Sequence, residues 1–413
     1  MSAPDPQVLS RRGLAQGGAA NAAAAIIASL AGLAVVLLAG RSMTPAEYAS
    51  FASVWGLVFG CAAILGALEQ EVARVRSSSH GAVDRTQLAA TGIIGVGAAA
   101  GMTVVVILLF EELRLVSPLV AALIVASAAV FPTMFTARGY LAGSMRLLSL
   151  SAVTVSEASL RLLVVLLGLW AALATVPTFA AGALCGALVG VPTLLRHSGW
   201  HQGAITIGAT LRRTGTLMLG NAMSALLVTG APVLVGLAMA HASVDAVGQM
   251  QAAVVISRFP LIALMLLQSL MVPVFVRRNS LYHGSDYRRI VLVLGAGIPV
   301  AAVASYAGGV WLLSLLYGQE YVVDPLEIAL LTTGATALGG IQVIIAMAVS
   351  GDRHRLSPLA FAPTLAVTSL LCFIPVAALS LRVPVAFACG PIAGFVVAVV
   401  STAHWRRQKA SAA

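Results

Sequence analysis

Apolar residues occur along this chain in long runs that are separated by short polar stretches. Each run has about 18 to 26 residues, enough for a helix to cross a hydrocarbon core of roughly 30 Å. Little chain is left between the runs, so the pattern predicts an all-α membrane protein with no soluble catalytic domain. About 12 transmembrane helices are expected, over residues 17–39, 46–68, 88–110, 116–135, 150–173, 178–195, 217–240, 247–272, 290–313, 325–349, 358–379 and 383–402.

Composition supports this pattern, and the distribution of charge gives it an orientation. Hydrophobic residues make up 60% of the 413 residues and charged residues only 9%, against roughly a quarter charged in soluble domains. A net charge of +10 alone would fit a nucleic-acid partner. With the predicted spans, however, nearly all basic residues fall on one side, and only Arg41, Arg114 and Arg382 fall on the other. Positive residues favour the cytoplasm, which predicts cytoplasmic N- and C-termini, a multi-pass protein and no nucleic-acid binding. Arg greatly outnumbers Lys and Ala is abundant, which suggests a bacterial gene and therefore the bacterial inner membrane.

Several other classes of protein are disfavoured by the sequence. The first apolar run is too long for a typical signal peptide and is followed by further spans, so we expect a retained helix. The four cysteines stand singly inside apolar runs and the histidines form no ligand set, which predicts no metal site and no cofactor. A nucleotide-binding loop, a nucleophile–His–acid set and a pair of catalytic carboxylates are all missing, so we expect no enzyme.

The two halves of the chain repeat each other at an offset near 200 residues. Asn21 corresponds to Asn221, Arg41 to His241 and Phe59 to Phe259. Six spans separate the equivalent helices, so both halves enter the membrane in the same orientation, as parallel repeats do. The repeat predicts two six-helix lobes, 1–203 and 204–413, around a cleft suited to alternating access.

Four stretches of the sequence resemble a known family. They lie in order along the chain and near predicted helix ends: Gly40-Arg-Ser-Met-Thr-Pro-Ala-Glu-Tyr48; Arg138-Gly-Tyr-Leu-Ala-Gly-Ser-Met-Arg146 with the following Glu157 and Arg161; Val247-Gly-Gln-Met-Gln-Ala-Ala-Val-Val-Ile-Ser-Arg-Phe-Pro260; and Leu316-Tyr-Gly-Gln-Glu-Tyr321. They resemble motifs of the Wzx-like bacterial polysaccharide flippases of the multidrug/oligosaccharidyl-lipid/polysaccharide (MOP) exporter superfamily. One departure is Thr229-Gly-Ala-Pro232, where many members carry an Asp in span 7.

The resemblance implies a MATE/MOP-like fold and a function. The substrate would be an undecaprenyl-pyrophosphate-linked oligosaccharide, moved from the inner to the outer leaflet for cell-envelope polysaccharide biosynthesis. The implied partners are this lipid-linked glycan, membrane lipids, and polysaccharide polymerase with other assembly proteins. A multidrug or small-solute exporter of the same superfamily is the alternative, although the missing acid weakens cation-driven efflux. A non-transport scaffold is a third possibility.

Ionisable residues inside membrane helices are costly and therefore mark functional candidates. Arg258 lies in predicted span 8, and a guanidinium can hold phosphate oxygens bidentately. We therefore hypothesise that Arg258, together with Arg161, binds the pyrophosphate, although Arg258 could instead bond carbonyls freed by a kink at Pro260. Glu157 and Arg161 are four residues apart and could equally form a structural ion pair.

The remaining candidates lie near predicted helix ends. Asn21 and Asn221 either line the cleft as a symmetric pair or bond between helices. Arg41 and Glu47 are expected at the outer edge, where Arg41 either gates the exit or reaches lipid headgroups. Arg138, on the cytoplasmic side, either belongs to a gate or fixes the topology.

Overall fold

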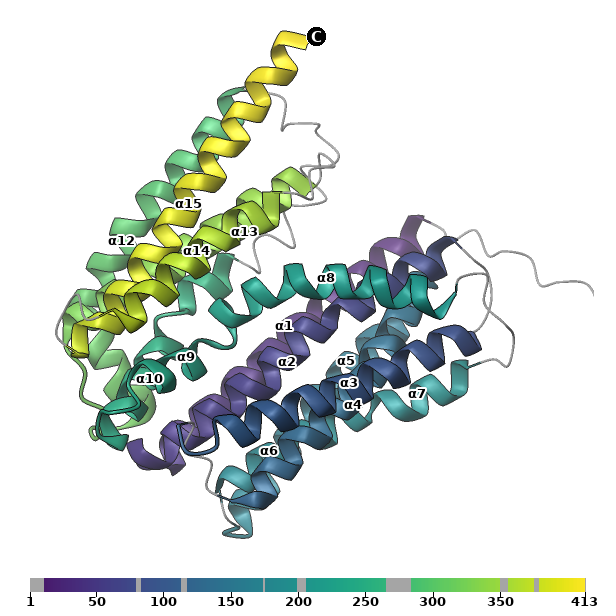
Figure 1. The fold of residues 1–413 in the computed structure, drawn as a ribbon, viewed down its shortest axis with the longest axis horizontal. Coiled ribbons are helices and arrows are strands. Elements are labelled where there is room, and N and C mark those ends of the chain that lie inside the picture. The colour runs from purple at the N-terminus through teal and green to yellow at the C-terminus, as the bar shows by residue number, and fades with distance from the viewer. Residues whose placement is uncertain are drawn as a thin grey trace, which may run out of the picture. The chain divides into compact units, whose positions relative to one another are not determined.

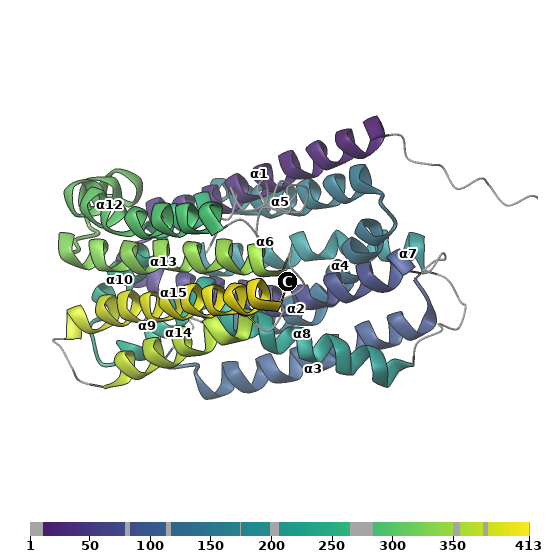
Figure 2. The same ribbon diagram turned by 90° about the horizontal axis from the view of Figure 1, so that it is seen from above.

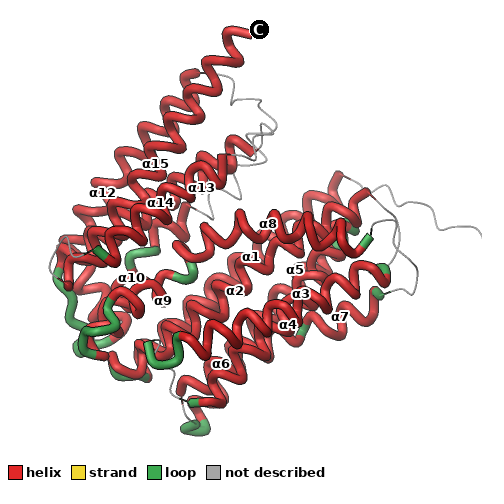
Figure 3. Tube along the Cα trace, viewed as in Figure 1, coloured by secondary structure: helices red, strands yellow, loops and turns green. Residues whose placement is uncertain are grey.

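The computed structural model describes residues 11–78, 83–112, 117–173, 175–198, 206–264, 284–349, 356–374 and 379–412. These residues are almost entirely helical, with short connecting loops (Figure 3). The helices are α1 (Arg11–Ser42), α2 (Pro45–Ser78), α3 (Arg85–Leu108), α4 (Pro118–Gly143), α5 (Leu147–Trp170), α6 (Thr175–Leu188), α7 (Gly190–His197), α8 (Ile207–Val228), α9 (Ala231–Ala238), α10 (Val244–Ile256), α12 (Gly284–Tyr317), α13 (Pro325–Val349), α14 (Leu356–Phe373) and α15 (Leu379–Ala412) (Figure 1).

The helices confirm the predicted membrane fold. In the described part of the chain, ten helices are long and apolar enough to cross a membrane, and α8 with α9 forms an eleventh, bent span. The shorter apolar helix of residues Pro358–Phe373 coincides with the remaining predicted span. Predicted span 8 extends to residue 272, and its last part lies outside the described residues. The protein is therefore a multi-pass membrane protein, while the cytoplasmic position of its termini stays a prediction.

The bend between α8 and α9 has a local cause. The two helices meet at 62°. Gly230 lies between them, and Pro232 is at the start of α9, where its missing N–H costs no helical hydrogen bond. Thr229 and Gly230 both donate to the carbonyl of Ala225, each at 2.8 Å, and this ends α8. The sequence Thr229-Gly-Ala-Pro232 therefore bends the span.

Helix starts are fixed by short polar side chains that cap exposed backbone N–H groups. Thr44 and Ser243 precede α2 and α10, and each accepts a bond from the N–H three residues on, at 3.4 and 3.3 Å. These two caps are separated by the offset near 200 that the repeat predicts. Asp84 accepts from the N–H of Gln87 in the same way. Such caps stabilise a helix start by about 1 kcal/mol each.

The described chain forms two compact units. Unit 1 comprises residues Met1–Val36, Ile64–Val106 and Leu119–Met218, and unit 2 comprises Leu37–Ala63, Ile107–Pro118 and Leu219–Ala413. In unit 2, α12 packs on α13, and α15 packs on both α13 and α14 (Figures 1 and 2). In unit 1, α5 packs on α6. Unit 2 thus takes in the end of α1 and the start of α2, and the division into lobes 1–203 and 204–413 stays a prediction.

Candidate functional site

Arg258 lies at a break in its helix. α10 ends at Ile256, and the next two residues form a turn in which Arg258 N–H reaches only to the carbonyl of Val255, at 3.2 Å. Pro260 has no N–H to offer to the carbonyl of Ile256, so the α-helical bond cannot form there. The helix then resumes, with Ile262 N–H donating to the Arg258 carbonyl at 3.0 Å. The helix is therefore interrupted next to Pro260, as expected, and Arg258 lies in the interruption.

The guanidinium of Arg258 is enclosed in protein. Its Nη2 is buried, and it has no hydrogen-bond partner within the described residues. The alternative role, a bond from Nη2 to a carbonyl freed by the kink, is therefore not seen. The charge of Arg258 acts on the phenol groups of Tyr48 and Tyr317. A buried cation with donor capacity to spare is suited to an anionic ligand.

Three of the four family-like stretches meet around Arg258 in unit 2. The Tyr48 and Tyr317 hydroxyls are 3.1 Å apart, and their rings meet edge to face with 5.3 Å between centroids. The Tyr321 hydroxyl donates to the carbonyl of Met43 at 3.1 Å. Burial raises the pKa of the Tyr321 phenol, so this hydroxyl stays a donor. From the sequence these tyrosines were noted only as parts of the family-like stretches, and their contact with one another was not predicted.

Arg41 and Glu47, predicted at the outer edge, make defined contacts. Arg41 donates from Nη2 to the carbonyl of Leu315 in α12. Glu47 accepts from the N–H of Thr44 at 2.9 Å, which completes a reciprocal cap with the Thr44 hydroxyl. Arg41 therefore joins two distant parts of the chain, and Glu47 fixes the start of α2.

Asn21 and Asn221 fall in different units, so their predicted pairing across a cleft stays a prediction. Asn21 is half-buried in α1. Asn221 in α8 donates from Nδ2 to the carbonyl of Ala63 at 3.4 Å. This contact is a bond between helices, one of the two roles considered for the residue.

Glu157 and Arg161 form an ion pair along α5 in unit 1. The side chains are 12% and 10% exposed respectively. α6 packs closely over the pair: a Cβ on Gly186 would lie 3.0 Å from the Glu157 carbonyl oxygen, and one on Gly182 would lie 3.1 Å from that of Arg161. The arrangement matches the structural ion pair that the spacing allowed.

Arg138 belongs to a group of charged residues at the ends of α2 and α4 in unit 1. It pairs with Glu69 at 3.2 Å. Nearby, Glu71 is buried and binds Arg74 through two hydrogen bonds, of 2.7 and 2.6 Å. The acids of these pairs were not among the predicted site residues. Only Glu71 had a signal in the sequence, because it lies three residues before Arg74 on the same helix.

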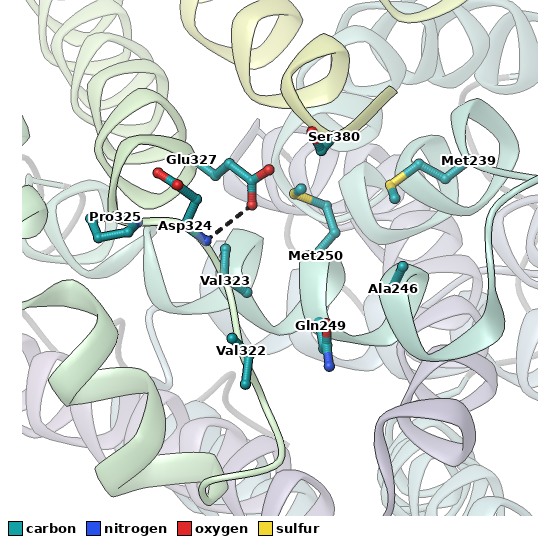
Figure 4. A pocket seen from close by; sticks show the side chains of 10 residues that line it. All are labelled: Met239, Ala246, Gln249, Met250, Val322, Val323, Asp324, Pro325, Glu327 and Ser380. Carbon is teal, nitrogen blue, oxygen red and sulfur yellow. Dashed lines mark hydrogen bonds between the residues drawn. The ribbon is translucent and has the colours of Figure 1, made fainter. Parts of the chain in front are cut away.

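A cavity of about 510 Å³ lies in unit 2 beside the start of α13 (Figure 4). Its lining includes Met239, Gln249, Met250, Asp324 and Glu327. Asp324 N–H donates to the Glu327 carboxylate at 3.3 Å, and the Leu326 N–H donates to the Asp324 carboxylate at 2.7 Å. Both acids thus cap α13, and the lining of the cavity includes none of the predicted site residues.

Comparisons with known proteins agree with this architecture. No family model matches the chain. An uncharacterized protein of Mycobacterium tuberculosis strain H37Rv is 29% identical over 408 residues, 92% of this chain and 90% of that protein. A second uncharacterized protein, of strain CDC 1551, is 29% identical over 418 residues, covering 95% and 93%.

Solved structures resemble the chain over nearly its whole length. An inward-facing multidrug resistance MATE family transporter of the MOP superfamily has a TM-score of 0.71 at 14% identity, covering 93% of this chain and 95% of that one. A MOP superfamily transporter from Pyrococcus furiosus has a TM-score of 0.66 at 14% identity, covering 97% and 95%. The lipid II flippase MurJ has a TM-score of 0.62 at 11% identity, covering 92% and 87%. These neighbours are transporters and flippases rather than enzymes, and the chain has the fold of MOP-superfamily transporters.

Proposed function

We propose that this protein flips an undecaprenyl-pyrophosphate-linked oligosaccharide from the inner to the outer leaflet of the bacterial cytoplasmic membrane, by alternating access. The observation that carries the proposal is the buried Nη2 of Arg258, which has no partner in the described parts of the chain. A diphosphate presents oxygens that a guanidinium can hold in pairs. The fold shared with a lipid II flippase supports a substrate of this kind.

Among the arginines predicted inside spans, the structure favours Arg258 over Arg161 as the phosphate ligand. Arg161 is engaged by Glu157 on its own helix. Arg258 lies instead near the uncharged phenols of Tyr48 and Tyr317, and no carboxylate pairs with it within the described residues. A pyrophosphate would supply the missing negative charge.

The test of this role is a series of substitutions at one position. Arg258→Ala is expected to lower transport about 100-fold, because charge-assisted hydrogen bonds worth roughly 3 kcal/mol are lost. Arg258→Lys keeps the charge but not the bidentate geometry, so partial activity is expected. Arg289→Ala, at an exposed position of α12, is the matched control. Full transport by Arg258→Ala would remove the basis of the assignment.

The substrate itself is tested in a deletion strain. We expect loss of the gene to trap the lipid-linked oligosaccharide on the cytoplasmic leaflet, where it stays inaccessible to a glycan-binding probe added outside the cell. Complementation with the intact gene should restore outside labelling. Unchanged labelling in the deletion strain contradicts the proposed function.

Export of drugs or other small solutes is the second candidate. It is supported by the fold shared with multidrug resistance MATE family transporters, whose inward-facing and outward-facing structures give TM-scores of 0.71 and 0.62. The same deletion strain separates the two: drug hypersensitivity with normal glycan labelling identifies an exporter.

A further inference from the structure

The residues that surround the α1–α2 turn join the first two helices to the C-terminal half of the chain. All of them belong to unit 2, and the predicted topology puts them at the outer face of the membrane. We call this group the outer latch, and it consists of Gly40, Arg41, Met43, Pro45, Tyr48, Gly248, Leu315, Tyr317 and Tyr321.

Close backbone approach at two glycines brings the latch together. A Cβ on Gly40 would overlap the ring of Tyr317, and a Cβ on Gly248 would overlap the carbonyl oxygen of Pro45. Only glycine leaves room for these contacts. The glycines of the first and third family-like stretches are therefore explained by contact with a partner from the other half of the chain.

Polar and aromatic contacts hold the latch closed. They are the Tyr48–Tyr317 hydroxyl bond of 3.1 Å, the 3.1 Å bond from Tyr321 to the Met43 carbonyl, and the bond from Arg41 to the Leu315 carbonyl. The three rings also meet one another edge to face, at 5.3 and 5.8 Å from Tyr48 and 5.3 Å between the other two. Tyr48 and Tyr317 are buried.

Every one of these bonds connects residues 41–48 to residues 315–321, and none links two residues of the same half. Two of the three use neutral groups, whose net contribution in proteins is modest. None of these three bonds belongs to the backbone hydrogen bonding of a helix, so each can break without unfolding a helix. A seam of this type can open and close while the helices on each side stay intact.

We propose that the outer latch is the gate on the exit side of the transporter, and that its opening releases the substrate to the outer leaflet. The inference rests on the proposed function, because alternating access requires the two halves to separate at that face.

The test is a reversible cross-link across the latch. The Tyr317 Cγ lies 2.9 Å from the position of a Cβ on residue 40, so the two Cβ atoms are at most about 4.4 Å apart, given a C–C bond of about 1.5 Å. Disulfides join Cβ atoms at roughly 3.5–4.5 Å. Gly40→Cys/Tyr317→Cys, in a background without the four native cysteines, should therefore form a disulfide.

We expect the oxidised pair to lose at least ten-fold in transport and to regain it on reduction. The control is Gly309→Cys/Ile328→Cys, whose Cβ atoms lie 3.4 Å apart. It links α12 to α13 within one half and should leave transport unchanged. Full transport by a completely cross-linked latch overturns the inference. If the wild-type protein transports drugs, and oxidation of the Gly40→Cys/Tyr317→Cys pair blocks drug transport, the flippase function is refuted but the role of the outer latch is supported.

A second measurement applies if the cysteine pair does not fold. Tyr48→Phe/Tyr317→Phe removes the hydroxyl bond but keeps both rings. Ser53 is buried and accepts a bond from Gln251 Nε2 at 3.3 Å, so a cysteine there reports opening. A membrane-impermeant maleimide added outside should label Ser53→Cys several-fold faster in the double Phe background. Equal labelling rates count against the latch.

Discussion

Glu157 is the residue at which removal of one charge should have a large and interpretable effect. Glu157→Gln removes the counter-charge of Arg161, whose side chain is only 10% exposed. Gly182 and Gly186 of α6 pack against the carbonyls of the pair, so the guanidinium has little freedom to move to water. Breaking a buried pair costs about 3–5 kcal/mol in soluble proteins, and a charged residue at mid-helix costs about 2.5–3.5 kcal/mol on insertion scales. We therefore expect Glu157→Gln to lower the free energy of unfolding by about 3 kcal/mol.

The assay is thermal unfolding in detergent, followed with a thiol-reactive fluorophore. Cys185 lies on α6 beside Gly186 and is half-buried, so it becomes reactive as unit 1 opens. For a unit of this size 1 kcal/mol shifts the midpoint by about 2–4 °C, which gives a decrease of roughly 6–12 °C. The three other cysteines are replaced by alanine: Cys61, Cys372 and Cys389.

The double variant Glu157→Gln/Arg161→Gln separates a structural pair from a substrate contact. It leaves no unpaired charge, so we expect most of the lost stability to return and transport to stay within about three-fold of wild type. A double variant as unstable as the single one refutes the electrostatic reasoning. A stable double variant without transport shows that the pair contacts the substrate.

Three further effects concern residues of unit 2, and they should appear in the same unfolding assay when the buried Cys372 is kept as the reporter in place of Cys185. Glu47→Ala removes the acceptor for the Thr44 N–H and should cost about 1 kcal/mol, whereas Glu47→Gln should cost less; equal losses would contradict a capping role. Gln251→Met should cost roughly 1–3 kcal/mol, because the Pro232 carbonyl, which now accepts from Gln251 Nε2 at 2.7 Å, is left unsatisfied; no change in midpoint would show that water replaces the bond. Gly318 has φ +117°, so Gly318→Ala should cost about 1–3 kcal/mol, and a neutral result would show that the turn can relax.

The membrane fold could be predicted from the sequence because it follows from run length. Within the described residues, each predicted span coincides with an apolar helix or, for 217–240, with the bent pair α8 and α9. The ion pair of Glu157 with Arg161 was also within reach, since both lie on one face of one helix. Features that depend on periodicity or on spacing within a helix could thus be read in advance.

Contacts between distant residues could not be predicted in this way. Hydropathy carries no information on which helix neighbours which, so nothing in the sequence indicated that Tyr48 touches Tyr317 or that Glu69 pairs with Arg138. Arg41 donates to the carbonyl of Leu315. Every residue has a backbone carbonyl, so the sequence does not indicate which one accepts a hydrogen bond. The missing step is three-dimensional packing, which local patterns do not encode.

The membership of residues 37–63 in unit 2 has a consequence for how the protein is made. A ribosome at about 5–20 residues per second delivers the α1–α2 turn to the membrane tens of seconds before Tyr317. Throughout that interval the Met43 carbonyl and the Tyr48 hydroxyl lack Tyr321 and Tyr317, their partners in the folded protein. The first hairpin of the nascent chain therefore keeps an unpaired polar and aromatic surface in the membrane until the end of α12 has been synthesised.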